Sequence, residues 1–370
     1  MPRLSLFAGL LAGLAFVSAA PAWAGDKVLI VVSGEGRDQG KTRPGFEMDE
    51  FAQAYLIFRD NGLEVEVASP RGGRVEADKY DAKEPFNARL LADPQAQRLL
   101  ADTRATAGLR AQDYAAVYVV GGKGAMFDLP ADPALGSLIA AVYERGGVVS
   151  AVCHGPAALV GVRLADGRAL AAGRAMTGFS NEEETVFGKR WAKQYPFQLE
   201  DALRERGARW SEAALMMPHV VVDGRLVTGQ NPYSTPGVAE AVVAALGRTP
   251  VARTPWRDEK TMQLVRQRLA GDASAEQRLA QAPQDYHAQL IGLLGYYQLQ
   301  TAQAQPQVRD ALSIMQLAEP HMPEPQLRLG MAEAHLRLQQ REPARRLVAA
   351  VLESHPDMAE AKQLMERIGN

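Results

Sequence analysis

The sequence contains very little cysteine: Cys153 is the only one among 370 residues. A single cysteine cannot form an intramolecular disulfide, so it is either an inert buried side chain or one kept for chemistry. The net charge is small, −2 at neutral pH, and gives no overall positive field to attract nucleic acid or an anionic membrane. The six histidines lack the neighbouring acids or cysteines of a metal site. We therefore expect no metal and no nucleic-acid partner.

The first 24 residues have the features of a cleavable signal peptide. A positive charge precedes an apolar run, residues 4–20, which ends at Pro21. Residues 22–24 (Ala-Trp-Ala) form a small-x-small site for cleavage before Gly25. The alternative is an uncleaved membrane anchor, but the apolar run is close to the shortest length that can span a bilayer. The sequence thus predicts a periplasmic or secreted protein without a membrane segment after cleavage.

Residues 25–250 alternate short β-branched runs with helical stretches. Buried strands are predicted at residues 27–33, 63–69, 115–120 and 147–152, further strands at 174–177, 220–222 and 226–228, and a helix at 48–61. Near-continuous apolar strands separated by helices predict an α/β domain with a doubly wound, mostly parallel, flavodoxin-like sheet. Ligands bind such sheets outside the carboxyl ends of the strands, which indicates the segments after Val120 and Val152.

After Pro250 the composition changes. Glycine and β-branched residues become rare, and Ala, Leu, Gln, Arg and Glu dominate, which predicts helices alone. We assign residues 251–284 to a linker and leading helices, and residues 285–370 to a helical-repeat domain. We also expect few contacts across the boundary, so that a chain ending near Pro250 would still fold and keep its activity.

Within the helical domain, a pattern recurs that is similar to tetratricopeptide repeats. Ala311, Met315, Ala318 and Pro323 precede Ala344, Val348, Val351 and Pro356 by 33 residues each. A plain helical bundle packed on the first domain remains the alternative.

The cysteine lies in a predicted strand-to-helix turn. Residues 150–159 (SAVCHGPAAL) come directly off a strand, and a Gly-Pro pair begins the next helix. Such a turn raises a nucleophile at the end of the sheet and forces its backbone into a sparsely populated conformation. The N–H of His154 then points to the side of the thiol, and Gly122 offers a second N–H. Two such donors predict an oxyanion site at a carbonyl attacked by Cys153.

Five segments resemble the ThiJ/PfpI superfamily, in the branch of cofactor-free glyoxalase III enzymes and heat-shock holding chaperones. They are residues 121–129 (GGKGAMFDL), 151–159 (AVCHGPAAL), 177–184 (TGFSNEEE), 196–200 (PFQLE) and 223–232 (DGRLVTGQNP). The resemblance covers about residues 27–247. It implies that Cys153 is the nucleophile of a glyoxalase III-like lyase, which converts 2-oxoaldehydes such as methylglyoxal to 2-hydroxy acids.

The resemblance also implies two acids. The first lies five residues after a glycine near the start of the first helix, here Glu50, while Glu47 and Asp49 lie on other faces of that helix. The second orients the histidine after the cysteine, His154. Its motif places it at Glu184, with Glu182 and Glu183 left open because the register is uncertain by one residue.

One departure from the superfamily pattern concerns Lys123, where relatives often carry histidine. A lysine at the pocket mouth would favour a carboxylate-bearing substrate, unless it simply faces solvent. Protein deglycation by the same residues remains open, as does a holding chaperone or adaptor whose repeats bind protein or peptide. Glutamine amidotransfer fits less well, because its histidine lies far downstream of the cysteine and His219 lacks a following acid. Relatives often form homodimers, but nothing in this chain specifies one.

Overall fold

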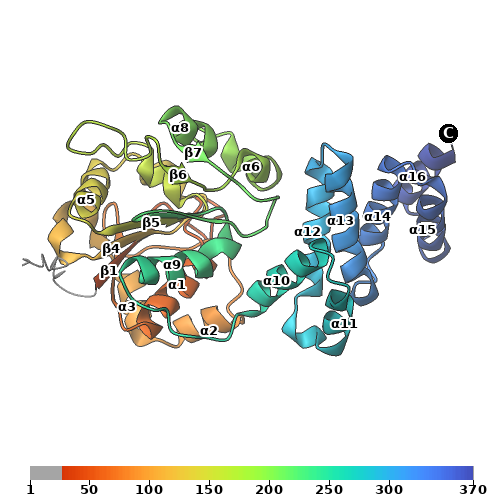
Figure 1. Cartoon of the computed structure of the whole chain (residues 1–370), viewed down its shortest axis with the longest axis horizontal. Coiled ribbons are helices and arrows are strands. Elements are labelled where there is room, and N and C mark those ends of the chain that lie inside the picture. Colours follow the sequence, from red (N-terminus) through yellow and green to blue (C-terminus); the bar gives the residue numbers. More distant parts are fainter. Residues whose placement is uncertain (1–26, 370) are drawn as a thin grey trace, which may run out of the picture.

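The computed structural model describes residues 27–369, so the expected signal peptide, residues 1–24, lies outside the described residues. An α/β part is followed by an elongated helical part (Figure 1). No helix within residues 27–369 has both the length and the apolar character needed to cross a bilayer.

The α/β part is built on a seven-stranded sheet of order β3-β2-β1-β4-β5-β9-β8. All neighbouring strands are parallel except β8 and β9, which confirms the predicted mostly parallel sheet. The central strands β1, β4 and β5 are almost entirely buried, as strands covered on both faces must be. The bounds are Lys27–Val31 (β1), Glu64–Ser69 (β2), Arg104–Ala105 (β3), Ala116–Val119 (β4), Val148–Val152 (β5), Val220–Asp223 (β8) and Leu226–Gly229 (β9).

Helices cover both faces of the sheet, so the fold is doubly wound as predicted. Helices α1 (Met48–Asp60) and α9 (Thr235–Ala245) lie together on one face, and α5 (Pro133–Glu144) lies on the other (Figure 1). The remaining helices are α2 (Pro85–Leu91), α3 (Pro94–Ala101), α4 (Ala125–Asp128), α6 (Asn181–Phe187), α7 (Lys189–Ala192) and α8 (Leu199–Glu205).

One predicted strand does not join the main sheet. The segment at 174–177 forms β6 (Ala175–Met176), which pairs in parallel with β7 (Arg209–Trp210) in a separate two-stranded sheet. Asp223 at the end of edge strand β8 accepts a hydrogen bond from the N–H of Ala175 at 2.8 Å and pairs with Arg174 at 3.1 Å. These side-chain contacts hold β6 beside the sheet edge without a backbone ladder to β8.

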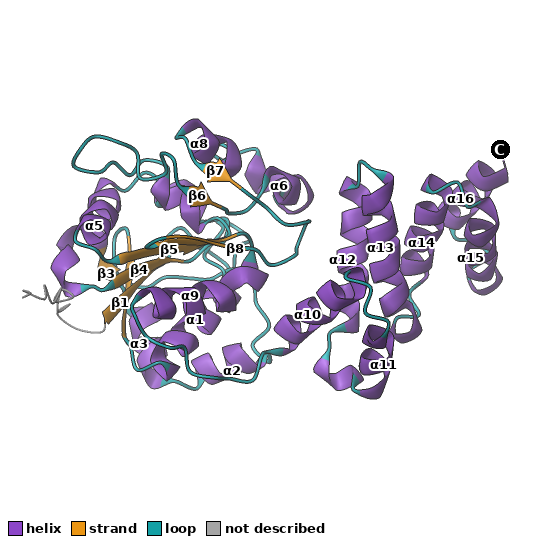
Figure 2. Ribbon diagram, in the orientation of Figure 1, coloured by secondary structure: helices purple, strands orange, loops and turns teal. Residues whose placement is uncertain are grey.

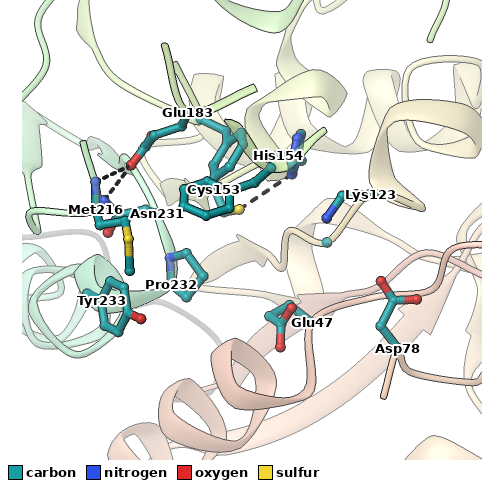
Figure 3. A pocket seen from close by; sticks show the side chains of 13 residues that line it. Glu47, Asp78, Lys123, Cys153, His154, Glu183, Met216, Asn231, Pro232 and Tyr233 are labelled. Carbon is teal, nitrogen blue, oxygen red and sulfur yellow. Dashed lines mark hydrogen bonds between the residues drawn. The ribbon is translucent and has the colours of Figure 1, made fainter. Parts of the chain in front are cut away.

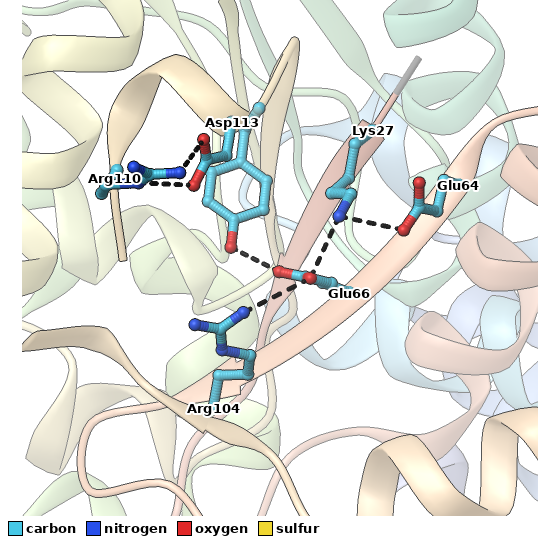
Figure 4. A network of polar contacts seen from close by, with 7 residues as sticks. Lys27, Glu64, Glu66, Arg104, Arg110 and Asp113 are labelled. Atoms are coloured by element: carbon cyan, nitrogen blue, oxygen red, sulfur yellow. Dashed lines mark hydrogen bonds and ion pairs between the residues drawn. The ribbon is translucent and has the colours of Figure 1, made fainter. Parts of the chain in front are cut away.

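A polar network ties β1, β2 and β3 near their amino ends (Figure 4). The Lys27 ammonium lies 2.9 Å from Glu64 and 3.1 Å from Glu66, and Arg104 lies 3.5 Å from Glu66. The hydroxyl of Tyr114 donates to Glu66 at 2.5 Å. Partly exposed pairs of this kind contribute about 0–1 kcal/mol each. The network therefore supports the sheet from the end opposite to the expected site.

Every regular element described after residue 256 is helical (Figure 2). The two helices of each of the pairs α12–α13 and α14–α15 pack against each other. Ala311 and Met315 in α13, and their counterparts Ala344 and Val348 in α15, are all fully buried. The recurrence thus has a packing basis, while its assignment to tetratricopeptide repeats stays a prediction. The helices are α10 (Arg257–Leu269), α11 (Ser274–Gln281), α12 (Ala288–Thr301), α13 (Gln305–Ala318), α14 (Pro325–Arg337), α15 (Arg341–Ser354) and α16 (Ala359–Gly369).

The boundary near Pro250 is crossed by more contacts than the composition predicts. The apolar cluster of the helical part includes Met217, and Met216 and Tyr233 pack against it. The loop between β7 and β8 makes this contact because it projects toward α12 (Figure 1). The side-chain amide of Gln298 in α12 donates to the carbonyl of Leu215 at 2.9 Å, and this hydrogen bond is buried. The two parts therefore share apolar surface at this boundary, while the domain division stays a prediction.

Candidate active site

Cys153 follows β5 directly and has a positive φ of 59°. This left-handed conformation costs a non-glycine residue about 1–2 kcal/mol. Two backbone hydrogen bonds hold it: the N–H of Cys153 donates to Gly229 at 2.9 Å, and the N–H of Phe179 donates to the Cys153 carbonyl at 2.8 Å. The chain then forms a short 3₁₀ helix, Gly155–Leu159, where a helix was expected. Cys153 therefore lies on a strained elbow.

The glycine pair after β4 lets two other segments approach the elbow. A side-chain Cβ at Gly121 would lie 2.7 Å from the Cβ of Cys153 and 2.8 Å from Oε2 of Glu50. Gly122 has a φ of 89°, and a Cβ there would lie 2.5 Å from the backbone nitrogen of Glu47. The N–H of Gly122 faces the thiol and opposes the rise of the Cys153 pKa that burial causes. Only glycines fit at these two positions.

Glu50 is a fully buried carboxyl in α1, beside the thiol. Its Oε2 accepts a hydrogen bond from the N–H of Gly121 at 2.6 Å, whereas its Oε1 has no partner among the described residues. Burial, followed by the nearby charge of Glu47, raises the Glu50 pKa well above its ordinary value. The Glu50 carboxyl therefore holds a proton to higher pH than an exposed glutamate does, and it has one oxygen without a hydrogen-bond partner among the described residues.

His154 connects the thiol to a second carboxylate. Its Nε2 lies 2.8 Å from Oε2 of Glu184, and its Nδ1 lies 3.5 Å from the sulfur of Cys153. Both side chains are buried, and the ring of Phe179 covers the imidazole at a centroid distance of 4.3 Å. Of the three consecutive glutamates, Glu184 makes the contact with His154.

Burial also raises the pKa of the Cys153 thiol well above its ordinary value, and the Glu50 carboxylate adds to this rise. The thiol is therefore protonated at rest. Its activation depends on a proton acceptor in contact with it, here Nδ1 of His154, and on donors such as the N–H of Gly122.

Glu183, which the sequence left open as the partner of His154, is a buried acid with other partners. Its Oε1 accepts hydrogen bonds from the side-chain amide of Asn231 at 2.9 Å and from the N–H of Met216 at 3.1 Å. Its other oxygen caps α6 through the N–H of Ser180. Burial raises the Glu183 pKa to about 7. Glu183 and Asn231 both lie in the quoted family motifs, but only the fold shows that they meet.

Of these groups, Cys153, His154 and Glu183 line a cavity of about 190 Å³ (Figure 3), whereas Glu50 and Glu184 do not line it. Cys153 and His154 lie on one side, Lys123, Glu47 and Asp78 on another. Glu47 has a pKa of about 8, raised mainly by burial and by Asp49 and Asp78, and the Lys123 charge opposes this rise. Lys123 lines the cavity as expected, but the carboxyl groups of Glu47 and Asp78 line it as well. Phe187, Met216 and Tyr233, which no sequence signal indicated, also line the cavity.

Two other groups lie outside this arrangement. Asp49 accepts a hydrogen bond from Asn87 at 2.6 Å and does not line the cavity. His219 contacts the hydroxyl of Ser211 at 2.9 Å and lines a different pocket, so no amidotransferase-like triad forms with it. Within residues 27–369, no three His, Cys, Asp or Glu side chains are grouped as metal ligands.

The fold and the site together define an α/β protein with a cysteine nucleophile elbow at the carboxyl edge of a parallel sheet. The sequence profile of the DJ-1/PfpI family matches residues 42–245, more than half of the chain, and the protein belongs to this family. The resemblance seen in the five sequence motifs is thus confirmed.

Several relatives are glyoxalases by name. A glutathione-independent glyoxalase of Schizosaccharomyces pombe is 31% identical over 219 residues, which cover 54% of this chain and 86% of the relative. A glutathione-independent glyoxalase of Saccharomyces cerevisiae is 32% identical, and the match covers 56% of this chain and 91% of that relative. The crystal structure of glyoxalase III from Candida albicans is similar to this protein with a TM-score of 0.55 and 28% identity. The match covers 59% of this chain and 96% of the Candida albicans chain. All three similarities leave the helical part largely unmatched.

Proposed function

We propose that this protein converts small 2-oxoaldehydes such as methylglyoxal to 2-hydroxy acids without a cofactor, yielding D-lactate from methylglyoxal as a glyoxalase III-like lyase. The observation that carries the proposal is the position of Cys153 and His154 in the wall of one small cavity, with the Glu50 carboxyl beside the thiol and Glu184 paired with His154. The names of the relatives support the same chemistry.

The first step is addition of the thiol to the aldehyde carbon. His154 takes the proton of Cys153 through Nδ1, and Glu184 stabilises the imidazolium that forms. The sulfur bonds to the aldehyde carbon, and the developing oxyanion faces the N–H groups of Gly122 and His154. Glu50 then gives its proton to this oxygen, which leaves a hemithioacetal, a Glu50 carboxylate and a protonated His154.

The second step moves hydrogen between the two substrate carbons. The Glu50 carboxylate removes the proton from the former aldehyde carbon, and His154 protonates the neighbouring oxygen, giving an enediol. Glu50 returns its proton to the second carbon while His154 takes the hydroxyl proton of the first. One carbon is oxidised and its neighbour reduced, so no external redox partner is required.

The resulting thioester is hydrolysed in the last step. Glu50 accepts a proton from water, the hydroxide adds to the thioester carbon, and the Cys153 sulfur leaves with a proton from His154. Methylglyoxal plus water thus becomes lactate, and all three side chains recover their resting states.

The walls of the cavity favour an uncharged substrate over a carboxylate. A carboxylate near Lys123 would also meet Asp78, whose like charge opposes it. We therefore propose that Lys123 contacts the carbonyl oxygens of the aldehyde. Removal of early glycation adducts from proteins would use the same three catalytic side chains on a larger substrate.

The test is lactate production from methylglyoxal by purified protein, measured with enzymes specific for each lactate enantiomer. We expect D-lactate with no added thiol or metal, and none from the Cys153→Ala variant. Lactate formation that survives this substitution would overturn the proposal.

A second candidate function is binding of apolar peptide segments by the helical part, as in a holding chaperone or adaptor. The observation that favours it is a groove of about 590 Å³ between α12, α14 and α16. Leu329, Met358 and Leu364 line it beside the ion pair of Glu333 and Arg367. We expect the protein to suppress aggregation of a thermally unfolding client, with a loss in Met358→Asp and none in Cys153→Ala. If both variants suppressed client aggregation equally well, the groove would be excluded as the peptide-binding site.

We further propose that the chain is exported and cleaved before Gly25. The support is the apolar run followed by the small-x-small site. Amino-terminal sequencing of the protein recovered from the periplasmic or extracellular fraction tests this. An amino terminus at Met1 would contradict it.

A further inference from the structure

Met216 is a strained residue in the wall of the catalytic cavity. It lies in the loop between β7 and β8 and has a φ of 64°, in the left-handed region that non-glycine residues rarely adopt. Such a conformation persists only where the surroundings hold it. The hydrogen bonds on either side of Met216 show what holds it.

Two parts of the chain form hydrogen bonds on either side of this residue. Its own N–H donates to Glu183 of the α/β part at 3.1 Å. The carbonyl just before it, on Leu215, accepts the buried amide of Gln298 from α12 at 2.9 Å. The Met216 side chain also packs against the apolar cluster of the helical part. Its position in the cavity wall therefore depends on α12.

A second contact from α12 reaches the opposite part of the same wall. The ring of Tyr297 meets Phe187 edge-to-face at a centroid distance of 5.1 Å. Phe187 lines the cavity and lies 6.5 Å from Phe179, which in turn covers His154 at 4.3 Å. A continuous row of rings thus leads from the helical part to the catalytic imidazole.

We infer that α12 supports the wall of the catalytic cavity from outside, and that Tyr297 and Gln298 are positioning residues that set the width of the substrate site through Phe187 and Met216. This deepens the proposed function and rests on it for the aldehyde turnover. The helical part would then determine which aldehydes reach Cys153, in addition to anything that its own groove binds.

The test compares Gln298→Ala and Tyr297→Ala with two matched controls. Gln289→Ala removes an exposed amide from the same helix, and Tyr297→Phe keeps the ring that meets Phe187. The first measurement is the rate at which Cys153 reacts with iodoacetamide and with a bulky fluorescent maleimide. The second is kcat and KM for methylglyoxal and for the larger phenylglyoxal, with thermal midpoints recorded for every variant.

We expect the two alanine variants to raise the maleimide-to-iodoacetamide rate ratio at least about threefold, because a wall residue released by about 1 Å changes access strongly. The KM for methylglyoxal should rise about threefold to tenfold with kcat changed less than about twofold, since looser walls weaken binding alone. Both controls should behave like the parent.

A purely structural role would lower the thermal midpoint and leave the rate ratio unchanged, and that result would overturn the inference. If Tyr297→Ala does not fold, Phe187→Leu removes the same contact from the other side and must raise the ratio. Absence of aldehyde turnover in every protein, the parent included, would refute the proposed function, while the thiol reactivity still decides the inference about α12.

Discussion

The carboxylate of Glu184 lies 2.8 Å from Nε2 of His154, and both side chains are buried. With Glu184 as the acceptor, Nε2 carries the imidazole proton and Nδ1 is the basic nitrogen that faces the Cys153 sulfur at 3.5 Å. The carboxylate thus fixes both the orientation and the tautomer that deprotonation of the thiol requires.

Glu184→Gln should therefore lower kcat/KM for methylglyoxal about 10²-fold, within the usual range for disturbed acid–base catalysis. An amide can donate to Nε2 and place the proton on Nδ1, where it blocks transfer from the thiol. The neighbouring Glu182→Gln is the control and should retain parental kinetics. Equal losses in both variants would show that the helix end, and not this contact, matters.

Cys153→Ala should abolish turnover and leave the fold intact, because it removes one thiol and little volume. Cys153→Ser should be nearly inactive as well, since a hydroxyl is a far weaker nucleophile at neutral pH. Circular dichroism and lactate formation measure the two effects separately. Parental activity in either variant would assign the chemistry to another group.

Glu50→Gln should reduce turnover by about 10²–10⁴-fold, the range for loss of a general acid–base group. The thiol should still react with iodoacetamide, because His154 remains. Glu47→Gln is the comparison, because Glu47 lines the cavity whereas Glu50 lies beside the Cys153 thiol. A larger loss in Glu47→Gln than in Glu50→Gln would transfer the proton-shuttle role to Glu47.

The stability of the protein should fall as the pH rises from about 4.5 to about 8, because burial raises the Glu47 pKa to about 8 from 4.5. In this window the folded state holds a proton that the unfolded chain has released. Each such acid lowers the free energy of unfolding by up to about 1.4 kcal/mol per pH unit. Burial shifts the pKa of Glu183 in the same direction, to about 7.

Urea unfolding at about pH 5.5 and about pH 7.5 measures this slope. Glu47→Gln cannot release a proton, so its free energy of unfolding should change less between the two conditions than that of the parent. Identical changes in the two proteins would show that Glu47 ionises freely in the folded state.

A chain ending after Pro250 should be poorly soluble and have little activity, contrary to the expectation from composition. Removal of α10–α16 would expose Met216, Met217 and Tyr233, which pack in the apolar cluster of the helical part. It would also remove the Gln298 amide from the Leu215 carbonyl. Thermal midpoint and lactate formation compare the two lengths. A soluble, fully active short chain would show that the α/β part maintains the cavity unaided.

The sequence alone determined the parallel sheet, the elbow and the helical character after Pro250. Apolar strand runs, helical spacing and the residues of a tight turn are local patterns. They can be recognised in the sequence without knowing which segments they pack against. The family motifs added Glu50 and Glu184, which the structure places beside Cys153 and His154.

Only the tertiary structure decided which distant segments surround the sheet and the cysteine elbow. Asn231 meets Glu183 across 48 residues of sequence and Gln298 meets Leu215 across 83, and no periodicity encodes either contact. The position of β6 beside the sheet likewise depends on Asp223, far along the chain. The spacing that places a residue on one helix face does not specify which distant surface that face covers. The contacts that α12 makes with the cavity-wall residues Met216 and Phe187 therefore exist only once the two parts of the chain have packed together.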